Sequence, residues 1–330
     1  MELRQLKYFL AVADSGSLSR AALEVFVAQS ALSKQVGELE QELGVMLLHR
    51  SRTGVAMTEA GKTFYLYAQA ILKQLDDVKS AVRSSPQHIV GAVVLAFPQS
   101  VSAELTLPLP LIRAAREQLP GVSLRLNEEL TGNMLDRLRQ GHIDLAIFSP
   151  VEGEPDMVFL PFVEEEFYLL RGMDPMPGLP DEGDVDLASV ARHAVIMPSQ
   201  VHNHCTRGPF AATLERAGLP LKIATEINSV HILKAAVEAC MAPTVMPFEL
   251  ATHEIAQGRM RAHRIRPERA SRILAICHAS HIPLTNAKKA VCELVLSAAR
   301  QLCADGQWTG ATYIGPERPI SSRDGAVSNR

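Results

Sequence analysis

The N-terminal part of the chain has the apolar spacing of successive amphipathic helices. Apolar residues recur there every three or four positions, at Leu3, Leu6, Phe9, Leu10 and Ala13. This spacing predicts a first helix that buries one face. The polar run 14–17 interrupts the pattern, and Ser17 is suited to cap a second helix that ends near Leu23. A third helix is expected from about Gln29 to Leu43, because Gly44 suits the left-handed position that ends many helices.

The third predicted helix has two different faces. Leu32, Val36 and Leu39 are spaced to pack on the preceding helices. The leading edge is polar, and its side chains can hydrogen-bond to base edges or phosphates: Gln29, Ser30, Ser33 and Lys34. A short helix, a tight break and a helix with a polar front place side chains in the major groove of DNA. The leading edge is therefore the predicted DNA-binding surface.

A basic turn follows this helix. Residues 49–54 read His-Arg-Ser-Arg-Thr-Gly between alternating apolar flanks, which predicts a two-stranded wing. From a wing, Arg50 and Arg52 can reach phosphates or a minor groove. The alternative is that both are ordinary solvated charges on a small helical domain. The DNA-binding interpretation is favoured because the polar helix, the wing and the next helix occur together.

A long helix is expected after the wing, with Thr58 as its cap. Its apolar residues alternate steps of three and four positions: Phe64, Tyr67, Ile71, Leu75, Val78 and Val82. Such a heptad-like seam is typical of a helix that pairs with its own copy. All of these residues except Tyr67 are therefore assigned to a dimer interface. The alternative is packing on its own domain, but charged residues on the other faces favour dimerisation. A dimer would present two recognition helices to two half-sites.

From about residue 90, short apolar strands alternate with helices, which implies an α/β domain with mostly parallel sheets. The first lobe is expected at about 89–163 and 266–303, and the second at about 164–265. The predicted strands are 90–97, 122–127, 143–148, 167–171, 194–197, 223–227, 244–246 and 273–277. The predicted first-lobe helices are 98–118, 131–140 and 286–303. Two lobes joined by two crossings leave a cleft between them.

Helix starts and strand ends around such a cleft are where ligands bind in α/β domains. The polar residues expected there are Ser100, Ser102, Thr131, Ser149, Asn228 and Ser229, with Ser199 and His202 on a loop that can close over a ligand. Backbone N–H groups at the helix starts favour a carboxylate or another anion. The alternative for each of these residues is simple helix capping.

The N-terminal segment resembles the winged helix-turn-helix of LysR-type transcriptional regulators. The matching runs are 6–9, 17–22, 29–33, 39–40, 43–44 and 58–61. Weaker similarity continues to about residue 303. The resemblance implies a winged helix-turn-helix domain at 1–58, a linker and dimerisation helix with a hinge at 59–88, and a two-lobed, periplasmic-binding-protein-like effector domain at 89–303. Ala28 and the runs 47–48 and 53–55 resemble the corresponding residues of one branch of this family, the nitrogen assimilation control regulators.

The chain departs from the family pattern in two places. Ala28 and Ser30 stand where the family usually has Ser and Pro, and losing a Ser N-cap costs a helix about 1 kcal/mol. Residues 239–243 replace a turn that is glycine-rich in relatives, so added bulk there can narrow the cleft. Regulators resembling the nitrogen branch can also act without a dedicated small effector.

The resemblance implies a homo-oligomeric, sequence-specific transcriptional regulator in the cytoplasm, either a dimer or a homotetramer. Its expected partners are double-stranded DNA with an interrupted dyad upstream of target genes, a second copy of itself, a small organic effector and RNA polymerase. No cofactor and no membrane are implied. The alternative is a cytosolic small-molecule-binding module or enzyme with a DNA-binding-like head. No nucleophile–base pairing, phosphate-cradling glycine loop or metal cluster in the sequence supports catalysis.

Composition agrees with a modular protein. A chain of 330 residues suggests two or three domains, and 21% charged with 47% hydrophobic residues argues against disorder. The net charge is −3, and residues 1–86 carry ten Lys and Arg against nine Asp and Glu. DNA binding must therefore depend on local charge placement and on several copies. The start of the chain lacks a signal-peptide pattern, and no apolar run is long enough to span a membrane.

The five cysteines have no paired spacing, which suits reduced cytosolic thiols. The run 202–205, His-Asn-His-Cys, can supply soft metal ligands, but a solvent-facing loop is favoured and no metal is predicted. Residues 304–330 have little periodicity and are expected to form a flexible tail. Trp308 and Tyr313 are candidates to anchor the first part of that tail.

Overall fold

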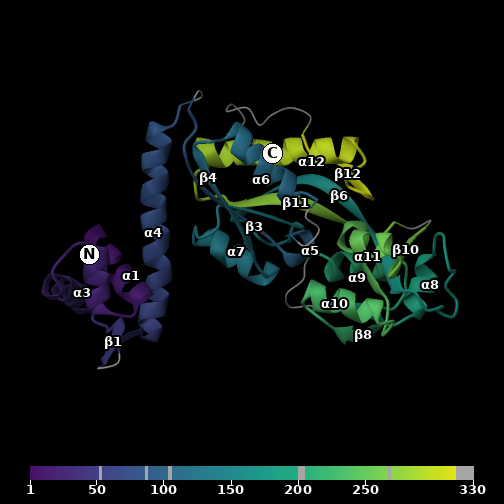
Figure 1. The fold of residues 1–330 in the computed structure, drawn as a ribbon, viewed down its shortest axis with the longest axis horizontal. Helices are drawn as coiled ribbons and strands as arrows, with labels where there is room; N and C mark the ends of the chain where they lie inside the picture. Colours follow the sequence, from purple (N-terminus) through teal and green to yellow (C-terminus); the bar gives the residue numbers. More distant parts are fainter. Residues whose placement is uncertain (52–53, 86–87, 103–105, 200–204, 267–268, 317–330) are drawn as a thin grey trace. The chain divides into compact units, whose positions relative to one another are not determined.

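The computed structural model describes residues 1–316 apart from 52–53, 86–87, 103–105, 200–204 and 267–268 (Figure 1). The chain divides into two compact units. The first comprises residues 1–83, and the second comprises residues 84–139 and those from 143 on, with residues 140–142 grouped with the first. No helix in the described ranges is long and apolar enough to cross a membrane.

The first unit is a helix-turn-helix with a wing and a long helix. Its elements are α1 Leu3–Ser15, α2 Leu18–Glu24, α3 Gln29–Leu43, β1 Leu48–Ser51, β2 Gly54–Met57 and α4 Glu59–Arg83. The two strands pair antiparallel, as predicted for the wing. The Ser17 hydroxyl accepts a hydrogen bond from the Arg20 amide, and Gly44 ends α3 with a φ of 70°. The predicted helix boundaries are thus confirmed, because capping chemistry is local to the sequence.

Helix α4 lies very close to the chain that leads into the wing. The Thr58 hydroxyl accepts from the Gly61 amide at 2.9 Å and donates to the Met46 carbonyl at 2.7 Å. The Thr58 amide donates to the Leu47 carbonyl at 2.9 Å. A Cβ atom on Gly61 would lie 2.0 Å from the Leu47 carbonyl oxygen, so only glycine fits this approach.

Replacing Gly61 with alanine is expected to destabilise the first unit by about 1–3 kcal/mol, the range for overpacked sites, because the added methyl group meets backbone. Gly37→Ala is the matched control. Nothing lies within 4 Å of the position that its methyl group would take, and it should stabilise α3 by roughly 0.5–1 kcal/mol. Urea denaturation of the two variants measures both effects. Equal stability of the two variants would contradict the close approach of α4.

The second unit has two lobes, each built on parallel strands. The first-lobe strands are β3 Gly91–Phe97, β4 Val122–Glu128 and β5 Leu145–Phe148, and the second-lobe strands are β7 Val195–Met197, β8 Ile223–Glu226 and β9 Thr244–Pro247. The remaining strands are β6 Met157–Gly172, β10 Met260–Arg264, β11 Ser271–Ala279 and β12 Ala311–Tyr313. The strand order is β4-β3-β5-β11-β6-β9-β7-β8, and β10 and β12 also pair with β6. The prediction of mostly parallel sheets holds inside each lobe, whereas β6, β10, β11 and β12 pair antiparallel.

Helices cover the sheets of both lobes. They are α5 Gln99–Ser102, α6 Pro108–Gln118, α7 Thr131–Arg139, α8 Leu187–Arg192, α9 Arg207–Arg216, α10 Val230–Glu238, the 3-10 helix η1 Phe248–Ala251, α11 Thr252–Ala256 and α12 Asn286–Ala304. Helices α6 and α12 cover one face of the first-lobe sheet, and α7 covers the other (Figure 1). The predicted helix 98–118 is two helices instead, because Pro108 is suited to start a new one.

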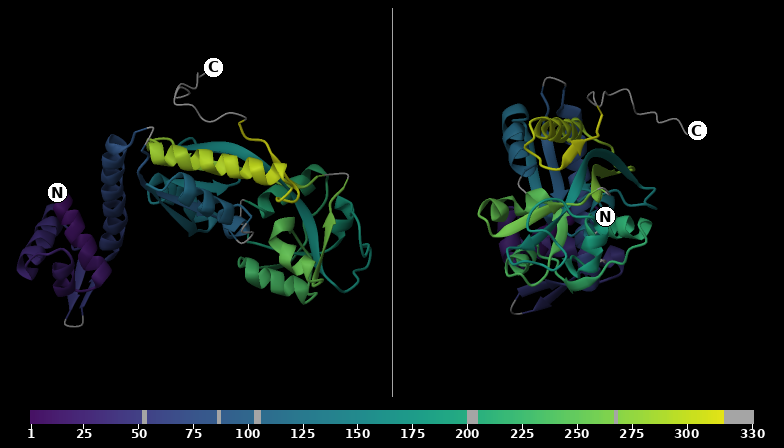
Figure 2. Two further views of the ribbon diagram at one scale, coloured as in Figure 1. Left: turned by 45° about the horizontal axis from the view of Figure 1, so that its top comes forward. Right: turned by 90° about the vertical axis from the view of Figure 1, so that its right-hand side faces the viewer.

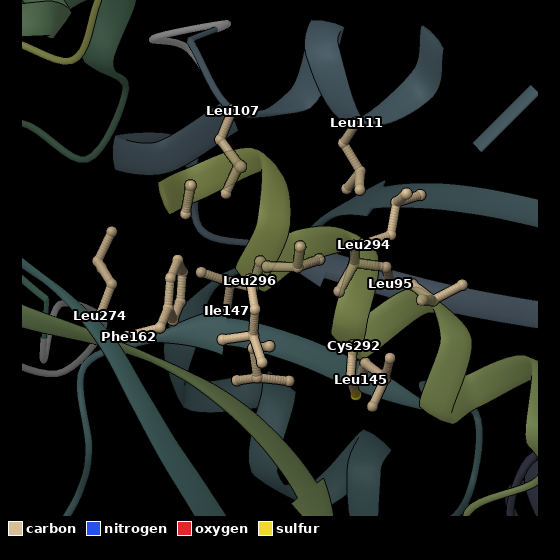
Figure 3. Packing of buried hydrophobic residues seen from close by; sticks show 14 of the residues in the cluster. Leu95, Leu107, Leu111, Leu145, Ile147, Phe162, Leu274, Cys292, Leu294 and Leu296 are labelled. Atoms are coloured by element: carbon tan, nitrogen blue, oxygen red, sulfur yellow. The ribbon is translucent and has the colours of Figure 1, made fainter. Parts of the chain in front are cut away.

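The largest core lies between the first-lobe sheet and the pair α6 and α12. Figure 3 shows side chains from these elements directed toward one another: Leu95, Leu107, Leu111, Leu145, Ile147, Phe162, Leu274, Cys292, Leu294 and Leu296. Burial of each such side chain is worth about 1.5–3 kcal/mol. The periodic apolar residues of the sequence therefore account for how the first lobe is held together.

Strand β6 crosses between the lobes without a break, which the sequence prediction missed. Its first part pairs with β11, and the part from Phe167 on pairs with β9 and β10 (Figure 2). The prediction had a separate strand at 167–171 and no strand at β10. In the sequence, the charged residues at 164–166 and 171 suggest that a strand ends there. In the structure, Glu164, Glu165 and Arg171 hydrogen-bond to side chains of the strands that pair with β6.

The expected flexible tail is wrong for residues 305–316. Trp308 is buried, with 2% of its surface exposed, and β12 pairs with residues 163–165 of β6. A large aromatic side chain and an open strand edge supply burial and backbone hydrogen bonds that the short segment lacks by itself. Residues 317–330 lie outside the described part of the chain.

Candidate nucleic-acid interface and inter-lobe cleft

Helix α3 has the two faces that the sequence predicts. Leu32, Val36 and Leu39 are fully buried against the other helices of the first unit. Gln29, Ser30 and Lys34 are exposed, and the Lys34 side chain is 74% exposed. These polar groups are therefore accessible to a partner. Ala28 occupies the N-cap without a side-chain hydrogen bond, which confirms the expected loss of a cap.

The front of α3 is ordered by contacts with its neighbours. The Ser19 hydroxyl of α2 donates to Gln29 Oε1 at 2.9 Å. This bond orients the Gln29 amide at the start of the helix. Lys34 Nζ lies 3.8 Å from Glu38 Oε1, an exposed pair that contributes little stability. Gln29 is thus positioned in advance, whereas Lys34 keeps the reach and charge of a phosphate contact.

Arg50 of the wing, a predicted DNA contact, is held by α3. Its guanidinium donates to Ser33 Oγ at 2.9 Å and to Glu40 Oε2 at 3.1 Å. Glu40 is buried, and its other oxygen accepts from the amides of Leu47 and Leu48. A buried carboxylate requires a counter-charge, so Arg50 joins the wing to α3. Arg52 lies outside the described residues.

Glu40 is a structural residue that sequence reasoning did not identify. It follows Leu39 on the apolar side of α3, in the same stripe as Val36. An acidic residue inside an apolar stripe indicates a buried partner, and this signal could have been used. The same contact covers part of Ser33, which is half-buried.

The expected dimer seam on α4 is exposed only from Tyr67 onward. Tyr67, Ile71, Val78 and Val82 are exposed, with Val82 82% exposed, and Leu75 is half-buried. Phe64 differs from the expectation because its ring packs edge-on against Phe9 at 5.1 Å between centroids. Phe64 therefore belongs to the core of the first unit.

Three of the predicted effector residues meet at one cavity in the second unit. The cavity is lined by Pro98, Gln99, Ser100, Glu129, Leu130, Thr131, Pro198, Ile227, Asn228, Val230 and Leu233. The predicted members among them are Ser100, Thr131 and Asn228. Its volume is about 30 Å³, comparable to one water molecule. The enclosed space between the described lining residues is therefore small.

A hydrogen bond between the lobes occupies the helix start that was expected to attract an anion. Gln99 Oε1, from the first lobe, accepts from the Val230 amide of α10 at 2.8 Å. Ser229 caps the same helix by accepting from the Ile232 amide, so the capping interpretation holds for it. Amides in the first turn of a helix have no acceptor within that helix. Gln99 therefore supplies the acceptor for the Val230 amide at the start of α10.

Several predicted effector residues have hydrogen-bond partners within the protein. Ser100 accepts from Arg272 Nη1 at 3.0 Å, although it also lines the cavity. The Ser199 amide donates to Asn228 Oδ1 at 2.8 Å, and the Ser149 amide donates to Cys205 Sγ at 3.3 Å. Ser149, Ser199 and Ser229 do not line the cavity. The Ser102 side chain and His202 lie outside what the structure describes.

The described residues contain no group of three or more metal-binding side chains, and most of the cysteines are buried at least in part. Burial raises the pKa of the Cys205 thiol, and it raises the pKa of Cys277 and of Cys292 to about 12. Their thiolate fraction at neutral pH is therefore very small. Cys240 is exposed.

Iodoacetamide at neutral pH is expected to label Cys240 well before Cys205, Cys277 or Cys292, because alkylation requires an accessible thiolate. Peptide mass spectrometry of the folded protein measures the order of labelling. A urea-unfolded sample is the control, in which all five cysteines should react. Early labelling of Cys205 would contradict its burial.

Comparisons with known proteins agree with this architecture. Residues 3–62 match the bacterial regulatory helix-turn-helix protein model of the lysR family, and residues 86–300 match the LysR substrate binding domain. The chain is 35% identical over 300 residues to the nitrogen assimilation regulatory protein nac of Klebsiella aerogenes, which covers 90% of this chain and 95% of that protein. The corresponding Escherichia coli (strain K12) protein is 34% identical over 254 residues, 76% of this chain and 80% of that protein.

Solved structures share the fold. Full-length CbnR complexed with its target DNA has a TM-score of 0.68 at 23% identity and covers 90% of this chain and 100% of that chain. An H2O2-bound OxyR mutant from Corynebacterium glutamicum has a TM-score of 0.60 at 21% identity, with coverage of 94% and 97%. The exposed polar face of α3, the two-lobed second unit and the two family matches together lead to one conclusion. The chain belongs to the LysR family of bacterial regulators and is a DNA-binding transcriptional regulator rather than an enzyme.

Proposed function

We propose that this regulator reads DNA with the front of α3 and does so as a homo-oligomer on an interrupted dyad. The observation that carries the proposal is the accessible set Gln29, Ser30 and Lys34 on a helix whose opposite face is buried. Gln29 is suited to a base edge, because its amide can both donate and accept. Lys34 is suited to a phosphate, where a point charge is sufficient.

Arg50 and Ser33 support this surface indirectly. Their hydrogen bond and the Arg50–Glu40 ion pair fix the wing against α3. The wing is then presented at a constant position relative to the recognition helix. The net charge of −3 gives no general attraction to DNA, so this local ordering and the use of two copies must supply the affinity.

Self-pairing through α4 supplies the second copy. The exposed apolar residues Tyr67, Ile71, Val78 and Val82 lie along one side of that helix at heptad-like spacing. An apolar stripe on an exposed helix is typical of a coiled-coil partner surface. A dimer is the smallest assembly that offers two recognition helices, and a tetramer would pair two such dimers.

A small effector would have to open the cleft of the second unit. The cavity has room for about one water, and Gln99 occupies the start of α10. The described residues that line the cavity include Glu129 but no Lys or Arg, which disfavours an anionic effector. An effector would therefore replace Gln99 and shift the population between closed and open lobes. Such a regulator would act on RNA polymerase in the cytoplasm.

Gln29→Ala should lower discrimination between operator and unrelated DNA by about 1–3 kcal/mol, the value of one good base contact. Gln41→Ala is the matched control, because Gln41 is exposed at the other end of α3. The measurement is capture and sequencing of DNA fragments by the purified protein, followed by affinity titration on a selected site. Identical fragment preferences for both variants would exclude Gln29 from base reading, and binding equal on all sequences would overturn the proposed function.

A further inference from the structure

The chain does not leave the second unit where α12 ends. Residues 306–316, named here the C-terminal strap, turn back and lie along β6. The Glu166 amide donates to the Gly310 carbonyl at 2.8 Å, and the Ile314 amide donates to the Phe162 carbonyl at 2.9 Å. Between these bonds, β12 pairs antiparallel with residues 163–165. The strap therefore adds a strand to β6 on the first-lobe side of its crossing.

The strap also contacts the second lobe. The Thr309 amide donates to Glu249 Oε1 at 2.7 Å. Glu249 belongs to η1, directly after β9, and β9 pairs with β6 from Phe167 onward. The other Glu249 oxygen accepts from the Thr106 hydroxyl of the first lobe at 3.2 Å. One carboxylate of the second lobe is thus bonded both to the strap and to the first lobe.

A buried chain of polar contacts connects the strap to the cleft. Trp308 Nε1 donates to Glu165 Oε1 at 2.8 Å, and the other oxygen of Glu165 accepts from Arg272 Nε at 2.6 Å. The side chains of Glu165 and Arg272 are fully buried. Arg272 then donates to the hydroxyl and the carbonyl of Ser100, which lines the cavity. Buried networks of this kind have little freedom to rearrange in part, because an unpaired member is costly.

We propose that the C-terminal strap holds the two lobes closed and so controls the opening of the cleft. Two lobes joined only by crossing strands can rotate about those strands. The strap joins the crossing to Glu249 on one lobe and, through Trp308, to Ser100 on the other. Release of the strap breaks the contact with Glu249 and the contact that runs through Trp308 at the same time. This inference concerns the second unit alone and stands whether or not an effector binds.

Amide hydrogen exchange on the full-length protein tests the proposal at two places. The Glu166 amide reports contact with the strap, whereas the Val230 amide reports closure, because Gln99 of the other lobe is its acceptor. A chain that ends after Asp305 lacks the strap, and a chain that ends after Pro316 keeps it and is the matched control. We expect the shorter chain to exchange about fivefold to tenfold faster at both amides, as loss of about one hydrogen bond implies. The control should match the full-length protein.

Faster exchange at Glu166 with unchanged exchange at Val230 would overturn the proposal, because the strap would then act only locally. A second pair of variants decides the matter if the shorter chain fails to fold. Glu249→Ala removes the bonds to Thr309 and Thr106, whereas Glu249→Gln can keep both. Trp308 is the single tryptophan of the chain, so its fluorescence reports strap release directly. Faster Val230 exchange and stronger acrylamide quenching of Trp308 in Glu249→Ala than in Glu249→Gln support the strap, and equal behaviour of the two variants rejects it.

Discussion

Glu165→Ala is expected to destabilise the second unit by about 3–5 kcal/mol, the loss typical of breaking a buried ion pair from one side. Glu165 and Arg272 are both fully buried, so removal of the carboxylate takes away a charge partner of the guanidinium in a dry environment. The Trp308 indole loses its acceptor in the same variant. Urea denaturation of the full-length protein, followed by the fluorescence of Trp308, measures the loss.

Glu164→Ala provides the control for this result. It makes the same chemical change one position earlier on β6, at a half-buried residue that accepts a hydrogen bond from Ser271. Its cost should be about 1 kcal/mol. Similar losses of unfolding free energy for the two variants would show that the buried Glu165–Arg272 pair stabilises the fold no more than a single hydrogen bond does.

Ile71→Asp should convert the protein to a monomer and weaken binding to a two-half-site operator by about 10²–10⁴-fold. That factor is the avidity gained when a second binding event becomes intramolecular. The physical reason is that a carboxylate in a paired apolar seam must lose its water without gaining a partner. Light scattering reports the mass, and a titration on one operator fragment reports the affinity.

Ser80→Asp is the matched control for the seam. Ser80 lies on the opposite side of α4, about two and a half helical turns from Ile71. It should leave both mass and operator affinity unchanged. An Ile71→Asp protein that still sediments and scatters as a dimer would move the interface away from α4, and the dyad proposal would then need another pairing surface.

Two residues of the proposed sites also have partners within the fold. Arg50 neutralises buried Glu40, and Ser100 accepts from buried Arg272. Both have the side chains expected at a binding surface, and the sequence does not reveal that a buried group uses them. Substituting either residue would therefore change stability as well as binding, so Gln29 and Lys34 are better tests of DNA reading.

The sequence by itself determined the helix-turn-helix, the wing, the long helix and the order of most strands, because periodicity, caps and turn residues act over a few neighbouring positions. Ser17, Gly44 and Thr58 mark element ends for that reason. Only the tertiary structure decided which polar groups remain available to bind a partner and which are used inside the fold. Gln99 and Val230 are 131 residues apart in the chain and Trp308 and Glu165 are 143 apart, whereas Glu40 and Arg50 are ten apart but lie on different elements. An acidic residue in an apolar stripe, such as Glu40, signals that some buried partner exists. Which group becomes that partner depends on the burial created when separate elements pack, and no local pattern identifies it.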